Sequence, residues 1–265
     1  MSTPNASKGP NPLSVGWSVI RALVSVKRPQ PHDDSTAVVD HTALASILEC
    51  IKSEGVASLP DQRGSLADYR SDLESVDPDT LGETEALAYW LNLYNTGALD
   101  LAADAFASGS ISVLRLPGGF KRPWATVAGE TLSLDAIEHA KIRRFKDPRV
   151  HGALVCGSAS CPTLRYEPYV GDILSDQLDH QMRDFFAGGG VVVDGSTVLL
   201  SRILLWFGGD FVHPTRMPSF VPVTKSAVAA AVASWLPGEA KRLITSGGAA
   251  VDFQPYDWSL ACSIR

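Results

Sequence analysis

Apolar residues recur three and four positions apart in several stretches of the chain, a spacing typical of amphipathic helices. This periodicity predicts helices at residues 42–53, 65–73, 81–107, 133–146, 170–186, 225–236 and 238–245. Short alternating or apolar runs predict hairpins at 124–133 and 191–200 and strands at 150–156 and 251–260. Because these helices and strands do not alternate strictly, their order favours an α+β fold over a doubly wound parallel sheet.

The helix predicted at 81–107 is the longest and most apolar of these elements. It leaves almost no polar face, which is typical of a helix surrounded by protein, so we expect it to be the central helix. Asn92 and Asn95 lie on one side of it, and a buried amide without a partner costs on the order of 1–3 kcal/mol. Asn92 is expected to bind neighbouring backbone, whereas for Asn95 this role and the lining of a pocket both stay open.

We predict an α+β architecture in which a long buried central helix packs on a small, mainly antiparallel sheet with surrounding helices. Residues 1–38 are expected to form a flexible N-terminal arm, and residues 39–265 a single globular domain. The apolar run at 13–26 predicts a short amphipathic helix that packs on the domain rather than on a membrane. Four large aromatic side chains are expected in the core: Trp90, Trp206, Phe207 and Trp258.

Composition and charge narrow the classes of function. Of the 265 residues, 45% are hydrophobic and 20% are charged, so the chain can bury a substantial core. The net charge of -6 argues against a nucleic-acid partner, which needs a basic stripe. The four cysteines are too few and too scattered for a disulfide framework, and the N-terminus lacks the order of an export signal, so a cytoplasmic location is expected. No apolar run is long enough for stable membrane insertion.

Residues 147–162 combine an apolar strand, a histidine, two cysteines and a turn rich in glycine and serine. A loop at the end of a buried strand is where a rigid scaffold presents reactive side chains. Cys161 is the preferred nucleophile, because its turn permits both exposure and a lowered pKa. Ser160 competes with it as a hydroxyl nucleophile. Cys156, at the end of the strand, is more simply a small core residue, although it also belongs to the candidate site.

A thiol nucleophile needs a base within hydrogen-bond reach and a third group that orients this base. The chain offers candidates for both roles, namely His139 and His151 for the base and Asn95 and Glu138 for the orienting group. Backbone N–H groups of the turn at 157–160 would stabilise an oxyanion. Within the strand, His151 and Cys156 leave opposite faces, so a dyad requires this turn to fold back and carry Cys161 to a histidine. Each histidine alone is more simply a buried imidazole bonded to backbone.

Four spaced motifs carry a resemblance to a known family. They are Tyr89-Trp-Leu-Asn-Leu-Tyr-Asn95, Leu134-Asp-Ala-Ile-Glu-His139, the stretch from Asp147 to Gly157 with Ser160-Cys-Pro162, and Tyr256-Asp-Trp-Ser-Leu260. With these motifs, residues 66–260 resemble the family called domain of unknown function 547. The family name carries no established activity. Because some relatives are joined to glutaredoxin-like or signalling modules, the resemblance implies thiol chemistry or a regulatory role. Relatives can carry an acidic residue at the position of Cys161.

Three hypotheses about function follow. The first is thiol-dependent hydrolysis or acyl transfer on a small-molecule or peptide substrate, in a papain- or transglutaminase-like arrangement that uses no cofactor. The second is a zinc-binding domain whose ligands would be Cys156, Cys161, His139 and His151. The two cysteines have the spacing of one ligand pair, although no second close pair follows. The third is a non-enzymatic module for interaction with a protein partner or for regulation, in which the same residues stabilise a buried polar core.

Overall fold

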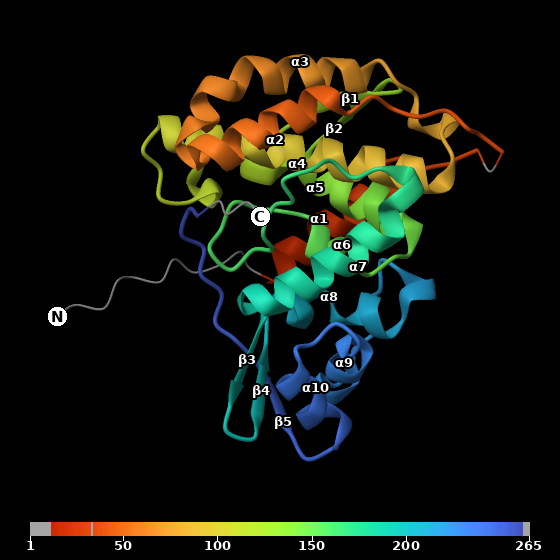
Figure 1. Cartoon of the computed structure of the whole chain (residues 1–265). Coiled ribbons are helices and arrows are strands. Elements are labelled where there is room, and N and C mark those ends of the chain that lie inside the picture. Colours follow the sequence, from red (N-terminus) through yellow and green to blue (C-terminus); the bar gives the residue numbers. More distant parts are fainter. Residues whose placement is uncertain (1–11, 33, 262–265) are drawn as a thin grey trace.

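The structure, a computed structural model, describes residues 12–32 and 34–261 (Figure 1). The arm predicted at the N-terminus therefore lies partly outside the described residues. Cys262 lies outside them as well. The helices are α1 (Pro12–Ser25), α2 (Thr42–Glu54), α3 (Arg63–Glu74), α4 (Glu83–Ala107), α5 (Leu134–Ala136), α6 (Val150–Ala153), α7 (Leu174–Phe185), α8 (Ile203–Val212), α9 (Lys225–Val232) and α10 (Gly238–Thr245). The strands are β1 (Ala125–Val127), β2 (Glu130–Leu132), β3 (Val191–Asp194), β4 (Thr197–Leu200) and β5 (Ala250–Phe253).

Tighter and wider helical turns complete the described part of the chain. The 3₁₀ turns are Val56–Gln62, Pro78–Thr80, Val113–Arg115, Gly119–Lys121, Ile142–Phe145, Gly171–Ile173 and Pro214–Arg216, and the π-helical turns are Ile137–Lys141 and Phe186–Gly190. The helix predicted at 133–146 is thus a continuous helical segment that changes its winding twice, from α5 through a π turn to a 3₁₀ turn.

The elements form two packed groups. Figure 1 shows α2, α3 and α4 with the β1–β2 hairpin at one end of the molecule, and β3, β4 and β5 with α9 and α10 at the other. Two clusters of buried apolar residues match this division, one gathered around α4 and one between α7, α8, α9 and the larger sheet. In the smaller sheet β1 and β2 are antiparallel; in the larger, β4 pairs antiparallel with β3 and parallel with β5. The predicted α+β class and both predicted hairpins are confirmed.

The long helix α4 is the centre of the larger group, as predicted. Every residue from Glu85 to Leu99 is buried, because apolar side chains cover all sides of the helix. It packs against α3, α5 and the turns Val56–Gln62 and Gly171–Ile173. Its main neighbours are therefore helical, whereas the sequence predicted that it would pack on the sheet.

The strand predicted at 150–156 is wrong, because its first half is helix α6. The Asp147 carboxylate accepts a hydrogen bond from the Arg149 N–H, and the Asp147 carbonyl accepts one from Val150, which starts a helical turn. Gly152 then packs so closely on α7 that a Cβ atom would lie 2.6 Å from Met182 Sδ. Residues 154–156 are not part of a strand, and a side chain of α4 binds this backbone instead, as described below.

Helix α8 was not predicted, because two glycines interrupt its apolar pattern. One of them, Gly208, lets α8 approach α9, since a Cβ atom there would lie 2.6 Å from Val228 Cγ2. The prediction that four aromatic side chains lie in the core holds for Trp90 but not for Trp206, which is 42% exposed. Trp206 instead packs on Tyr256 and Trp258 at the surface.

Helix α1 occupies most of the apolar run predicted to be an amphipathic helix. It packs on α5 and the following π turn through Val19 and Ala22, which are buried. Trp17 on another face is 69% exposed. Across the described residues, every helix is too short or too polar to pass through a bilayer.

A close contact between Glu85 of α4 and Gly171 gives a first prediction. The Glu85 carboxylate accepts hydrogen bonds from the Val39 and Gly171 N–H groups, so it fastens two separate segments to the central helix. A Cβ atom on Gly171 would lie 2.9 Å from the Glu85 backbone nitrogen. We expect Gly171→Ala to lower the free energy of unfolding by about 1–3 kcal/mol in urea denaturation. Gly64→Ala is the control; nothing lies within 4 Å of its added Cβ, so its effect should be neutral or stabilising.

Candidate functional site

The two buried amides of α4 bind backbone in the same way. Asn95 Nδ2 donates to the Ala153 carbonyl at 3.1 Å, and its Oδ1 accepts from the Val155 N–H at 3.2 Å. Asn92 Nδ2 donates to the Tyr169 carbonyl at 2.8 Å, and its Oδ1 accepts from the Tyr169 N–H at 2.9 Å. The prediction for Asn92 is confirmed, and Asn95 has the same role. Asn95 thus holds the chain that leads into Cys156, and the hydrogen bonds of both its amide groups go to backbone rather than to an imidazole.

The Cys156 sulfur lies in a small cluster of polar groups. The hydroxyl oxygens of Ser158 and Tyr256 lie 3.0 and 3.3 Å from Sγ and 2.9 Å from each other. Cys161 lies on the other side, where its Sγ accepts the Cys156 N–H at 2.8 Å. The turn at 157–160 therefore folds back, as predicted, but it brings Cys161 to Cys156 rather than to a histidine.

The two thiols differ in acidity. Hydrogen bonding from Cys161, with further hydrogen bonds from Ser158 and Tyr256, lowers the pKa of Cys156 to about 6 even though burial opposes this shift. Burial, together with the charge on Cys156, raises the pKa of Cys161 well above its ordinary value. Cys156 is therefore the thiolate of the pair, whereas the sequence favoured Cys161 as the nucleophile. Both side chains are partly buried.

The last described residues cross over this turn. We call residues 254–261 the C-terminal strap. The N–H groups of Ala159 and Ser160 donate to carbonyls of the strap, and the Ser160 hydroxyl accepts the Asp257 N–H at 2.9 Å. The strap also brings Tyr256 to Cys156. Two of the N–H groups predicted to stabilise an oxyanion are thus already bonded, and Ser160 fastens the strap.

Both candidate histidines belong to a different cluster. Asp210, which is fully buried, accepts two hydrogen bonds from the Arg143 guanidinium, one from His151 Nε2 at 2.8 Å and one from the Ser219 N–H. His139 lies on the other side of Arg143, with Nδ1 3.1 Å from the guanidinium. A guanidinium can only donate, so His139 offers its Nδ1 lone pair to Arg143.

This surrounding keeps both imidazoles neutral. Burial and the neighbouring charge of Arg143 lower the pKa of His139 well below its ordinary value. Burial also lowers the pKa of His151, although Asp210 counteracts it. Within residues 12–32 and 34–261, no hydrogen bond joins an imidazole to a thiol. The predicted thiol–histidine dyad is therefore not formed, because the basic nitrogen of His139 faces Arg143.

Glu138 is the acidic group associated with the thiols. Tyr94 of α4 donates its hydroxyl to Glu138 Oε2 at 3.2 Å. Burial raises the pKa of Glu138 to about 7, although the charge of Arg143 counteracts it, and the charge of Cys156 contributes to the rise. Its carboxyl group can therefore gain or lose a proton near neutral pH. It contacts Tyr94 and lies near His139, whose Nδ1 is 3.7 Å from Glu138 Oε1.

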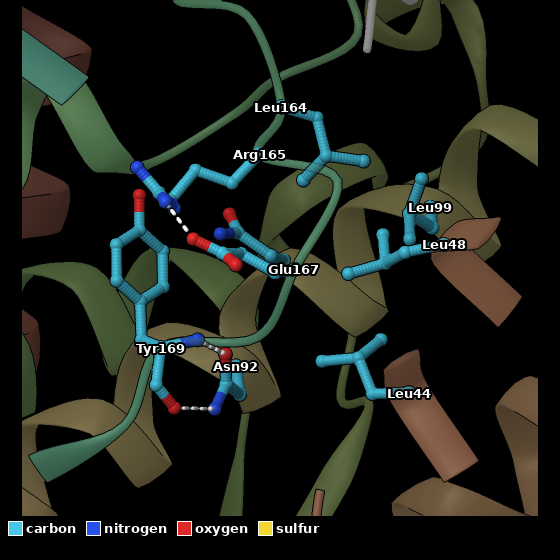
Figure 2. Close-up of a pocket in the computed structure, with 9 residues that line it drawn as sticks. Leu44, Leu48, Asn92, Leu99, Leu164, Arg165, Glu167 and Tyr169 are labelled. Carbon is cyan, nitrogen blue, oxygen red and sulfur yellow. Dashed lines mark hydrogen bonds and ion pairs between the residues drawn. The ribbon is translucent and has the colours of Figure 1, made fainter. Parts of the chain in front are cut away.

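Two small cavities adjoin these residues. One, with a volume of about 20 Å³, lies beside Cys161 and Ser158 and has room for about one water molecule. The other, of about 10 Å³, is lined by both amides of α4 (Figure 2). Figure 2 shows Asn92 bonded to the Tyr169 backbone, and Arg165 paired with Glu167 at the rim. Neither cavity holds a substrate of more than a few atoms, and Cys156 lines neither of them.

The arrangement does not favour the zinc hypothesis. Among the described residues, no group of three or more His, Cys, Asp or Glu side chains is placed to hold a metal ion. The Cys161 sulfur accepts the backbone N–H of Cys156, and the two histidines bind the Arg143–Asp210 ion pair. The ligand set considered from the sequence is thus divided between two separate clusters.

Two residues of the thiol cluster were missed by the sequence reasoning. Ser158 lies inside the turn at 157–160, and only its contact with Cys156 Sγ shows that it belongs to the site. Tyr256 lies a hundred positions away from Cys156 in the chain. The signal that could have found it is the terminal motif 256–260, which contributes to the family resemblance.

Comparison with known proteins gives a family match over part of the chain but no activity. A family model described as "Protein of unknown function, DUF547" matches residues 78–186. The resemblance inferred from the motifs is confirmed for this segment, which contains α4, both thiols and both candidate histidines, and which ends before α8 and Tyr256. No curated protein and no solved structure matches the chain.

Proposed function

We propose that a chain with this family match carries a thiol–disulfide exchange centre, in which Cys156 is the nucleophile and Cys161 resolves the mixed disulfide. One observation carries the proposal, which is the contact between an acidic and a non-acidic thiol. Cys156 is held as a thiolate by Cys161, Ser158 and Tyr256, while Cys161 stays protonated at neutral pH. Such a pair supplies an attacking thiolate and a second thiol beside it.

The reaction runs in two displacements. The Cys156 thiolate attacks one sulfur of a substrate disulfide, a bond forms between the two sulfurs, and the other substrate sulfur leaves as a thiolate that takes up a proton. Cys161 then loses its proton and attacks Cys156 Sγ, which forms the Cys156–Cys161 disulfide and releases the second substrate thiol. Two electrons pass from the protein dithiol to the substrate, and an external dithiol reductant returns them.

We infer that Glu138 takes part in the proton balance of the centre, because the charge of Cys156 contributes to the rise of its pKa. Its carboxyl titrates near neutral pH because burial raises its pKa to about 7, so it can hold a proton for part of the cycle. Burial raises the pKa of Tyr94, which donates a hydrogen bond to Glu138, and the charges of both thiols contribute to this rise. This environment supports a role for the Tyr94–Glu138 pair in the proton balance of the centre.

The acyl-transfer mechanism expected from the sequence uses the same thiols but needs an imidazole as base. Both histidines are engaged with the Arg143–Asp210 ion pair, so the contacts of Cys156 favour exchange over acyl transfer. A non-enzymatic role for the site is the outcome if neither thiol reacts in the experiment below.

A trapping experiment tests the proposal. Hydroxyethyl disulfide is mixed with the full chain and with its Cys161→Ser and Cys156→Ser variants at pH 7, and the products are identified by mass spectrometry. The Cys161→Ser variant should accumulate a mixed disulfide at Cys156, because no second thiol can release it. The unmodified chain should instead form the Cys156–Cys161 disulfide.

The Cys156→Ser variant provides the control, since it should react at least tenfold more slowly at Cys161 than the unmodified chain reacts at Cys156. A mixed disulfide that persists equally in the unmodified chain would contradict the resolving role of Cys161. Absence of any reaction at Cys156 would contradict the proposal as a whole and would leave an interaction module as the better reading.

A further inference from the structure

The structure points to a recognition surface beside the thiols, and we infer that it binds a non-acidic peptide disulfide with an aromatic residue next to the reacting half-cystine. This inference rests on the proposed exchange centre and names its substrate class. The surface consists of Trp206 from α8 with Tyr256 and Trp258 from the C-terminal strap, which we call the aromatic cluster.

The aromatic cluster is built from segments far apart in the chain. The Trp206 ring lies 4.9 Å from the Tyr256 ring and 5.6 Å from the Trp258 ring, centroid to centroid, and the two strap rings are 4.4 Å apart. Trp206 is 42% exposed and the two strap residues are partly buried. A partly exposed group of three large rings is typical of a binding surface, because tryptophan and tyrosine supply large contact areas with few rotatable bonds.

The cluster is continuous with the nucleophile. The Tyr256 hydroxyl lies 3.3 Å from Cys156 Sγ, so the same side chain touches the reacting atom with its hydroxyl and packs with its ring, tilted by 49°, on each of the other two rings. The space beside the thiols holds about one water molecule, and a substrate disulfide must therefore approach along the surface. A residue next to the half-cystine would then lie over the aromatic cluster.

Charge favours a neutral or basic substrate. Asp257 lies between the two strap rings in sequence, is exposed, and has its pKa lowered by hydrogen bonds from Ser259, so it is ionised at neutral pH. Aromatic faces also attract cations and aromatic edges rather than carboxylates. An anionic small disulfide is for these reasons a poorer match than a peptide with an aromatic side chain and no acidic group.

Two peptide probes test this inference. They are the disulfide-linked dimers of N-acetyl-Phe-Cys-amide and N-acetyl-Gly-Cys-amide, and hydroxyethyl disulfide serves as a small reference. We expect the Phe probe to oxidise the Cys156–Cys161 pair roughly 3- to 10-fold faster than the Gly probe, as suits one aromatic contact. Trp206→Ala should bring the ratio of the Phe-probe rate to the Gly-probe rate down to about one, and the rate with hydroxyethyl disulfide in the same variant gives its basal rate. Trp206→Phe should retain most of the preference.

The matched control is Trp17→Ala, which removes an exposed tryptophan on α1 and should leave every rate unchanged. Equal rates with both peptide probes would overturn the inference and leave the exchange centre intact. A Trp206→Ala variant that slows all three disulfides equally would also overturn it, since the cluster would then act only by holding Tyr256 in place. If no disulfide reacts at Cys156, the proposed function itself fails, and the two failures are thus distinguishable.

Discussion

Replacing Asp210 with alanine is expected to lower the free energy of unfolding by about 3–5 kcal/mol, a large part of the stability of a typical domain. Asp210 is fully buried and neutralises Arg143, whose side chain is only 3% exposed. Removal of the carboxylate leaves a buried guanidinium without its counter-charge and takes the hydrogen-bond partner from His151 Nε2. Urea denaturation followed by circular dichroism measures the loss.

A surface pair provides the comparison. Asp252 forms an ion pair with Lys225 in which both side chains are more than half exposed, so Asp252→Ala should change the stability far less than Asp210→Ala does. Equal effects of the two substitutions would show that the buried network contributes no more than an exposed ion pair. Asp210→Asn, which keeps the size of the side chain, should still be strongly destabilising if the lost charge is the cause.

The sign of the pH dependence follows from the pKa of Asp210. Burial raises this pKa, but the hydrogen bonds from His151 and Arg143 outweigh burial and lower the pKa below its ordinary value of 3.8. The folded state therefore binds fewer protons than the unfolded state at acidic pH. The contribution of the Asp210 carboxylate should be complete above about pH 5 and should be lost as the pH falls further. Its own titration should therefore add no slope to the stability gap between the Asp210→Ala variant and the unmodified chain between pH 8 and 5.

Local patterns were sufficient to predict most of the fold. The apolar periodicity of α4 and the alternation in the two hairpins are local signals, and each gave an element close to its observed place. The prediction of a strand at 150–156 was wrong because the conformation of this segment depends on distant residues. Met182 packs against Gly152, and the Asn95 amide binds the Val155 N–H. Helix α8 was missed because Gly208 and Gly209 weaken the helical pattern of the sequence. The glycine at 208 is explained only by the close packing of α8 against α9.

The candidate site shows the same division. The sequence identified both thiols, both histidines and the turn that folds back, because these residues are chemically conspicuous. It could not assign their partners, which depend on distances between segments. His139 and His151 form hydrogen bonds with the Arg143–Asp210 ion pair, since a buried guanidinium and carboxylate require nearby polar groups. Cys156 instead receives Tyr256 from a segment a hundred positions away.

The thiol pair itself leads to the second large expected effect. Cys161→Ala removes the hydrogen bond that lowers the pKa of Cys156 most, so the midpoint of thiolate formation should rise from about 6 toward the ordinary value of 9.0. At pH 7 the thiolate fraction would fall from roughly nine-tenths to roughly a tenth or less. The ultraviolet absorbance of the thiolate, titrated against pH, measures this fraction directly. Subtraction of the same titration for a variant that also carries Cys156→Ser isolates the signal of Cys156.

Alkylation rates would understate this change, because a thiolate of higher pKa is the stronger nucleophile and part of the lost thiolate is offset by faster attack. The absorbance midpoint has no such compensation. Cys50→Ala should leave it in place, since Cys50 lies in α2 and bonds to Gln62 rather than to the pair. Tyr256→Phe should raise it less than Cys161→Ala, because it removes a weaker donor and keeps the ring against Trp206. If the midpoint does not move in Cys161→Ala, the acidity of Cys156 does not come from its partner thiol, and the exchange centre loses its physical basis.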